Sequence, residues 1–150
     1  MVRMMSETQL PVLDHTIQLT NVWLKKLGEE HHLGEKYNCY SALRSVLHAL
    51  RDRLTPEQAV HFGAQLPILV RGIYYEGWHL SQSPTKDRQI DEFLARVAAE
   101  LPPAFPRDAL GVTKAVFDLL WKELDPGEIA KLIDALPIPL RGLWPQAAQR

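Results

Sequence analysis

The stretch Leu66-Pro67-Ile68-Leu69-Val70-Arg71-Gly72 occurs twice in this chain, and its second copy is Leu136-Pro137-Ile138-Pro139-Leu140-Arg141-Gly142. The two copies are 70 residues apart, and the same offset relates residues 40–74 to residues 110–144 without a gap. Nine of these 35 positions are identical, at Val46, Leu50, Leu54, Pro56, Leu66, Pro67, Ile68, Arg71 and Gly72 of the first copy. The chain therefore contains an internal repeat, which predicts architecture but no activity.

The composition limits the function classes. With 150 residues the chain has the size of one ordinary domain, and 17 basic against 18 acidic side chains leave a formal charge of −1. Such a balance provides no field for nucleic acid or an anionic membrane surface. The apolar runs are far shorter than a membrane span, and residues 1–7 show no signal region. The single cysteine, Cys39, excludes an intrachain disulfide and favours a reducing compartment, so we expect a cytoplasmic protein.

Apolar residues at helical spacing predict four helices in the first copy. The first covers residues 12–27 and ends at Gly28, because glycine adopts the left-handed cap conformation easily. The second carries the apolar face Leu43, Val46, Leu47, Leu50 and Leu54. Thr55-Pro56-Glu57-Gln58 is a capping box that begins the third. Pro67 forces a corner before the fourth, which Gly72 is expected to end.

The second copy repeats this plan after a serine- and proline-containing linker at residues 79–86. We therefore predict an all-α fold in which two tandem four-helix repeats, at about 12–78 and about 87–145, pack about a pseudo-twofold axis. Each repeat is too small to bury its apolar faces alone, so one bundle-like domain over 1–150 is expected. The alternative is two independent units joined by residues 79–86.

The motifs Leu-Arg-Asp-Arg-Leu (50–54), Thr-Pro-Glu-Gln (55–58) and Gln-Leu-Pro…Val-Arg-Gly-Ile-Tyr-Tyr-Glu-Gly-Trp (65–78) resemble a bacterial family. It is the domain-of-unknown-function family 2267, whose members are small helical proteins with an internal duplication. The resemblance extends from about Ile17 to Trp144. It implies a duplicated helical fold and carries no activity, catalytic residue or cofactor with it.

Histidines and the cysteine are the candidates for chemistry, and the repeat offers an internal comparison. His48 and His61 correspond to Asp118 and Lys131, and this exchange of polar types indicates solvated positions. The spacing of Glu29 and His32 matches the Glu-x-x-His motif of di-iron bundles, which makes Glu29, His31 and His32 an alternative metal site. The second copy has no matching ligands, so a polar connector is the preferred reading. Cys39 corresponds to Ala109, which favours a packing role over a nucleophile.

Arg71 and Arg141 are the charged residues that both copies of the repeated phrase share. They either bind an anion as a symmetric pair or have a structural role, in which each guanidinium satisfies nearby carbonyl groups at the helix end or pairs with a carboxylate; the structural role is preferred. We assign structural roles to both copies of the proline, arginine and glycine of the phrase: Pro67, Arg71, Gly72, Pro137, Arg141 and Gly142.

An aromatic run follows Gly72 in the first copy only. Tyr74, Tyr75 and Trp78, with Arg71 beside them, either seal the gap between the repeats or form an exposed interface.

No nucleotide-binding, nucleophile-elbow or CxxC motif is present. We therefore expect a non-enzymatic helical module without a cofactor that binds another protein or itself. The alternative is a small-ligand or metal-binding protein that uses the His31/His32 region or a cavity between the repeats.

Overall fold

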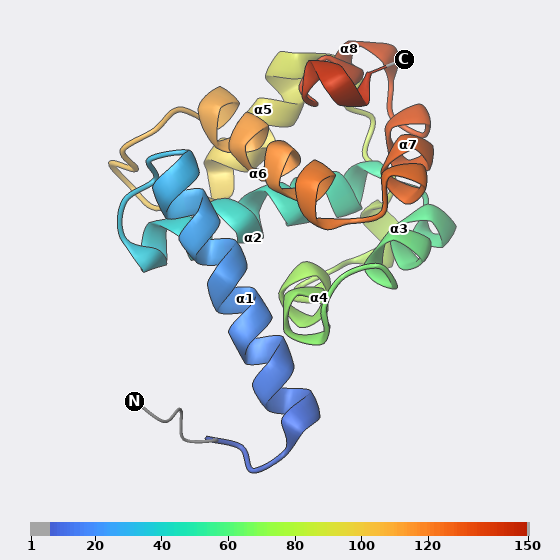
Figure 1. Cartoon of the computed structure of the whole chain (residues 1–150). Coiled ribbons are helices and arrows are strands. Elements are labelled where there is room, and N and C mark those ends of the chain that lie inside the picture. The colour runs from blue at the N-terminus through green and yellow to red at the C-terminus, as the bar shows by residue number, and fades with distance from the viewer. Residues whose placement is uncertain (1–6, 150) are drawn as a thin grey trace.

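The computed structural model describes residues 7–149, and this part of the chain consists of helices and their connections, without a strand (Figure 1). This confirms the all-α prediction. Within it there are eight α-helices and two short 3₁₀ helices. The helices are α1 (Pro11–Glu30), α2 (Lys36–Arg53), α3 (Pro56–Gly63), α4 (Ile68–Tyr75), η1 (Leu80–Gln82), α5 (Ile90–Glu100), α6 (Ala109–Glu123), α7 (Pro126–Asp134), α8 (Ile138–Arg141) and η2 (Gln146–Ala148).

The helix α2 lies in the interior, where α1, α4, α5 and α6 all pack against it (Figure 1). Its buried side chains occupy every face: Cys39, Ser41, Ala42, Leu43, Ser45, Val46, Leu47, His48, Ala49, Leu50 and Arg51. A helix buried all round is normally apolar. The polar members of this set therefore need partners inside the protein.

The first helix is longer than predicted. It continues through Gly28 to Glu30, so the expectation that Gly28 ends it is wrong. A Cβ at Gly28 would lie 3.2 Å from the carbonyl oxygen of Gly34 and 3.3 Å from the sulfur of Cys39. The glycine therefore serves the close approach of the next segment, and the left-handed residue comes later, at His32 (φ 56°).

The capping box that begins α3 is confirmed, since Thr55 accepts from the amide of Gln58 and Gln58 returns a hydrogen bond to the Thr55 amide. The corresponding acid pair at α7 makes only half of the motif. Asp125 accepts from the amide of Glu128, while the Glu128 side chain contacts His61 instead.

Gly72 does not end α4, which continues to Tyr75, and that expectation is also wrong. The left-handed residue after the helix is Gly77, with φ 73°. In the second copy α8 does stop at Gly142, but there the backbone keeps a right-handed conformation. Gly72 has open space where a Cβ would stand.

Helix starts keep the 70-residue offset in part of the chain: α3 and α7 begin at 56 and 126, α4 and α8 at 68 and 138. The first helices differ, because α1 has 20 residues and α5 has 11. Buried apolar residues from both halves belong to one hydrophobic cluster that includes Trp23, Leu47, Phe117 and Trp144.

The segment between the copies is attached to α2. The amide of Thr85 donates to the carbonyl of Asp52 at 2.7 Å, and the hydroxyl of Ser83 donates to the carbonyl of Leu54 at 2.9 Å. No helix in the described residues is long and apolar enough to cross a membrane.

Two glycines make a matched test of this packing. A Cβ at Gly63 would overlap the hydroxyl oxygen of Tyr75, whereas a Cβ at Gly72 would meet nothing. We expect Gly63→Ala to lower the free energy of unfolding by about 1–3 kcal/mol through overpacking. Gly72→Ala should raise it by about 0.5–1 kcal/mol, because alanine favours the helix. Urea denaturation measures both, and equal effects would contradict the packing around Gly63.

Candidate functional site

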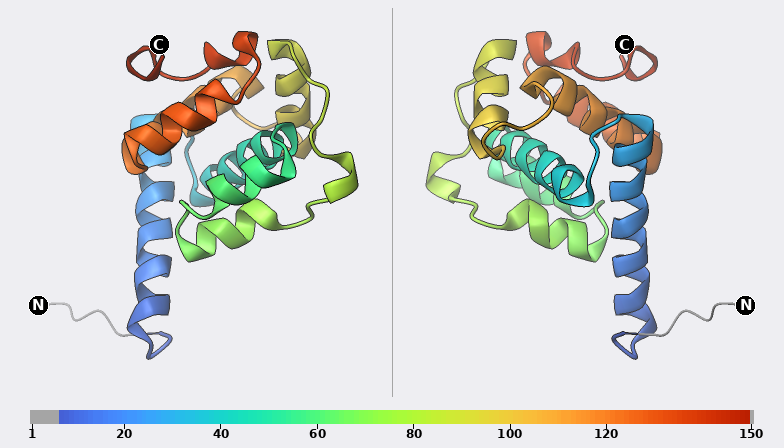
Figure 2. Two further views of the ribbon diagram at one scale, coloured as in Figure 1. Left: turned by 90° about the vertical axis from the view of Figure 1, so that its right-hand side faces the viewer. Right: turned by 90° about the vertical axis from the view of Figure 1, so that its left-hand side faces the viewer.

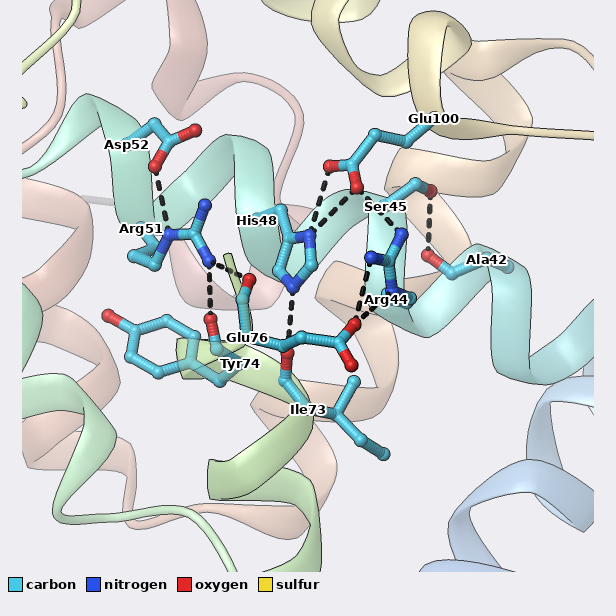
Figure 3. A network of polar contacts seen from close by, with 10 residues as sticks. All are labelled: Ala42, Arg44, Ser45, His48, Arg51, Asp52, Ile73, Tyr74, Glu76 and Glu100. Atoms are coloured by element: carbon cyan, nitrogen blue, oxygen red, sulfur yellow. Dashed lines mark hydrogen bonds and ion pairs between the residues drawn. The ribbon is translucent and has the colours of Figure 1, made fainter. Parts of the chain in front are cut away.

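A row of basic side chains on α2 forms the centre of the most extensive polar network of the described chain (Figure 3). Arg44, His48 and Arg51 are spaced by four and three residues, so they share one face of the helix. That face meets the C-terminal ends of α4 and α5, where helix carbonyl groups have no partner within their own helix.

His48 connects α2 to both of these ends. Its Nε2 lies 2.7 Å from the carbonyl oxygen of Ile73 on α4, and its Nδ1 lies 2.8 Å and 3.1 Å from the two carboxylate oxygens of Glu100 on α5. A carbonyl and a carboxylate both accept, so the geometry suits a ring that donates from both nitrogens. His48 is 3% exposed, and its assignment to a solvated face is therefore wrong.

Two arginines extend the network on either side of His48. Arg44 bridges Glu100 and Glu76, with nitrogen–oxygen distances of 2.8 Å to each. The buried Arg51 donates from Nη1 to the carbonyls of Tyr74 and Glu76, at 2.8 Å and 2.9 Å, and from Nε to Asp52. Three carbonyl groups at the end of α4 thus accept from one face of α2, and positive charge there also complements the helix dipole.

These contacts set the ionisation of Glu100. Burial works against its charged form, but the hydrogen bond from His48 and the positive charges of His48, Arg44 and Arg51 outweigh burial and hold the pKa of Glu100 below its ordinary value. Neither nitrogen of His48 is left to act on a substrate. The network therefore suits a structural clamp between three helices better than acid–base catalysis.

The predicted metal ligands are not brought together. Glu29 and His32 are exposed, and His31 instead places Nε2 2.9 Å from Asp118 on α6. Ligand atoms of Glu30, His31 and Asp118 lie within 4.8 Å of one another, but the ammonium of Lys122 contacts Asp118 at 3.0 Å and Glu30 at 3.4 Å. The hydrogen bond to Asp118 is the main reason that the pKa of Lys122 is raised. A lysine cation already pairs with both carboxylates of this cluster.

The two polar clusters occupy related positions in the repeat. Glu100 and Glu30 are 70 residues apart, and so are Asp118 and His48. His48 of α2 thus contacts the end of α5, while Asp118 of α6 contacts the end of α1. Each second helix meets the end of the other copy's first helix.

Arg71 and Arg141 act on the ends of the helices that precede them. Arg71 donates to the carbonyls of Gly63 and Leu66 at 3.0 Å and 2.9 Å, and Arg141 donates to those of Asp134 and Leu136 at 3.0 Å each. Both guanidinium groups thus satisfy helix-end carbonyls, the role that the sequence favoured over anion binding. Pro67 and Pro137 occupy the position just before α4 and α8 in each copy.

The aromatic run after Gly72 packs within the chain. Tyr74 is fully buried and donates its hydroxyl to the carbonyl of Ala59 at 2.7 Å, so it is not an exposed anchor. Tyr75 and Trp78 are half-buried and lie against the core. Ring centroids 4.9 Å and 5.6 Å apart join Tyr74 to Tyr75 and Tyr75 to Trp78. The run therefore packs mainly against α3 of the same copy.

His61 and Cys39 complete the sequence candidates. His61 is exposed and contacts Glu128 at 2.8 Å across a cleft of about 500 Å³ between α3 and α7. Cys39 is buried beside Gly28, and burial raises the pKa of its thiol, which opposes a nucleophilic role.

The sequence interpretation missed the network because comparison of the copies concealed it. His48 corresponds to Asp118, which indicated a solvated position, and Arg51 was not among the candidates. One signal was available: Arg44, His48 and Arg51 have helical spacing on a helix whose opposite face is apolar.

His48 and His61 form a matched pair, since each contacts a glutamate at 2.8 Å but only His48 is buried. We expect His48→Leu to lower the free energy of unfolding by about 2–3 kcal/mol, because it leaves the Ile73 carbonyl without its hydrogen bond from His48 and leaves Glu100 with Arg44 alone. His61→Leu should cost less than about 1 kcal/mol, as exposed ion pairs do. Chemical denaturation gives both values. Similar losses would contradict the clamp.

Glu100 gives a pH test. Since its pKa is lower in the folded chain, its charge stabilises the fold above the ordinary value of 4.5, and this contribution is lost as the pH falls through the folded pKa. Glu100→Gln should therefore lower the melting temperature at neutral pH, and the difference from the natural chain should shrink well below pH 4.5. A difference that stays constant with pH would show that the charge of Glu100 has no part in stability.

Comparison with known proteins agrees with the resemblance of residues 50–78. No curated protein matches the chain. A family model described as "Uncharacterized conserved protein (DUF2267)" matches residues 20–143, most of the described chain, and the protein therefore belongs to this family.

Proposed function

We propose that this protein is a non-enzymatic helical module that binds a second copy of itself through an apolar surface on α1 and α4. The observation that carries the proposal is the first part of α1, which extends beyond the rest of the protein (Figure 2). Val12 and Leu13 lie there, on the same side of the helix as the buried Thr16 and Thr20.

Apolar residues of α4 continue this surface. The amide of Leu69 donates to the hydroxyl of Thr16 at 2.9 Å, which places the start of α4 one turn from Leu13. Val12 is 58% exposed, Leu13 39%, Ile68 52% and Leu69 41%. We call these four residues the α1–α4 surface. Contiguous exposed apolar side chains are typical of protein contacts.

A second copy is the occupant that the charges favour. None of the four residues is charged, and a formal charge of −1 produces little repulsion between copies. A surface made by two helices can also meet its own image across a twofold axis, the commonest symmetry of soluble oligomers.

The fold around this surface is, in our proposal, a pair of four-helix units related by a pseudo-twofold axis. The reciprocal contacts of His48 with Glu100 and of Asp118 with Glu30's helix end support it. So does the cleft between α3 and α7, whose lining includes Gln58, His61 and Phe62 together with their counterparts Glu128, Lys131 and Leu132.

The repeat itself provides the control for the association test. Ile138, the counterpart of Ile68, is 74% exposed, but its neighbour is Pro139 and the counterparts of Val12 and Leu13 are Gln82 and Ser83. We expect Ile68→Lys and Leu13→Lys to convert a dimer into a monomer, measured as solution mass by light scattering. Melting temperatures should change little, since exposed substitutions usually alter stability by less than about 0.5 kcal/mol.

Ile138→Lys adds the same charge and should leave the dimer intact. A natural chain that stays monomeric at every concentration would refute self-association. Equal loss of the dimer in Ile138→Lys would show that added charge, not the α1–α4 surface, is responsible.

The second candidate is binding of a small ligand in the cleft between α3 and α7. Its support is the volume of about 500 Å³ and the apolar floor formed by Phe62 and Leu132. The metal form of this alternative has less support, because Lys122 already pairs with both carboxylates near His31.

A further inference from the structure

A second hollow lies where the end of α2 meets the connection to α5. It has a volume of about 630 Å³, and its lining comes from the last turn of α2, residues 77–87 and the first turns of α5. Three cations and three carboxylates line it: Arg51, Lys86, Arg96, Asp52, Asp87 and Glu92. Their formal charges cancel, so any ligand preference depends on which groups already have partners.

All three carboxylates already have hydrogen-bond or ion-pair partners within the protein. Asp52 accepts from Nε of Arg51, and the buried Asp87 accepts from Arg96 and from the hydroxyl of Thr85. Glu92 accepts from the amides of Arg88 and Gln89 at the start of α5. None of them needs a ligand cation.

Some N–H donors of the three cations have no acceptor within the described chain. Arg51 is 4% exposed and uses Nε and Nη1 within the protein, but among residues 7–149 nothing accepts from its Nη2. Nη2 also remains in contact with solvent. In the described chain, the fully buried side-chain nitrogens that lack a partner are the indole nitrogens of Trp78 and Trp144. The hollow is the solvent space that Arg51 lines. Lys86 is exposed at the rim, and within the described chain its ammonium has no ion-pair partner.

We propose that this hollow binds a small oxyanion, the phosphate or carboxylate group of a small molecule, between Nη2 of Arg51 and the ammonium of Lys86. A guanidinium held by fixed hydrogen bonds presents its remaining N–H groups without further ordering, which favours a planar or tetrahedral oxyanion. Arg96 adds free N–H groups, since only its Nε is bonded to Asp87.

The site has no equivalent at the related positions of the repeat. Arg51 and Asp52 correspond to Trp121 and Lys122 in the second copy, so the repeat does not require the arginine at this position. The site is also separate from the α1–α4 surface, because none of its lining residues belongs to that surface. Oxyanion binding and self-association can therefore be tested, and refuted, separately.

The test is titration of the ¹⁵N-labelled full chain with inorganic phosphate, and separately with acetate, at constant ionic strength. We expect saturable shifts of the amides of Gly77, Ser81, Thr85 and Lys86, which line the hollow. Saturation by both anions identifies a carboxylate-type site, and saturation by phosphate alone identifies a phosphate site. Either result supports the proposal.

Lys86→Glu should weaken the binding at least tenfold, since it replaces a ligand cation by an anion. Lys36→Glu is the matched control: it makes the same charge change on an exposed lysine of α2, about 22 Å along the helix from Arg51. Arg51→Lys keeps the charge but removes the fork, and should weaken binding about tenfold. Arg51 also donates hydrogen bonds to the end of α4, so Arg51→Lys could prevent folding. In that case the anion affinity of Lys86→Glu is the deciding measurement.

The proposal is overturned if neither anion produces saturable shifts at these amides. It is equally overturned if Lys86→Glu and Lys36→Glu weaken the shifts to the same extent, because the effect would then follow net charge alone.

Discussion

The interior helix α2 carries Arg51 and His48 into the protein, where every buried polar group needs a hydrogen-bond partner. The partners are the carbonyl groups at the end of α4 and the carboxylate of Glu100 at the end of α5. This requirement fixes where both helices stop relative to α2. The alignment of α4 in turn positions the aromatic run on α3, and the attachment of residues 83–85 to α2 positions the start of α5.

The two copies use related positions for different chemistry. His48 of the first copy is buried and meets Glu100 of α5, while its counterpart Asp118 lies in a partly exposed group with His31 and Lys122. The features with functional interest also lie in the first copy. The additional turns of α1 present Val12 and Leu13, and Arg51 faces the hollow beside the connection. The proposed binding surfaces therefore use residues that the sequence repeat does not share.

Much of the fold was predictable from the sequence, because local patterns determine it. The apolar stripe of α2, the capping box at Thr55 and the corner at Pro67 all specify structure through nearby residues. The glycines were harder. Gly28 serves a close approach to Cys39 and Gly72 serves no contact, and neither fact follows from residues next to them in sequence.

Most of the polar network around His48 could not be predicted from the sequence, because its contacts also join residues that are distant in the chain. The partner of His48 is 52 residues away and that of His31 is 87 residues away, so no spacing rule connects them. Arg71 and Arg141 were accessible because their carbonyl partners lie five to eight residues back. The metal alternative grouped Glu29, His31 and His32, which are close in sequence, whereas the ligand atoms that the structure brings together are those of Glu30, His31 and Asp118.

The central claim is that α2 binds the two copies into one cooperative unit. Native-state hydrogen exchange at increasing urea measures it directly, by comparing the opening free energies of amides in α2 with those in α6. The account predicts that both sets merge into one global unfolding reaction with the same free energy and urea dependence. Separate reactions, with α6 remaining protected after α2 has opened, would contradict it and identify two independent units.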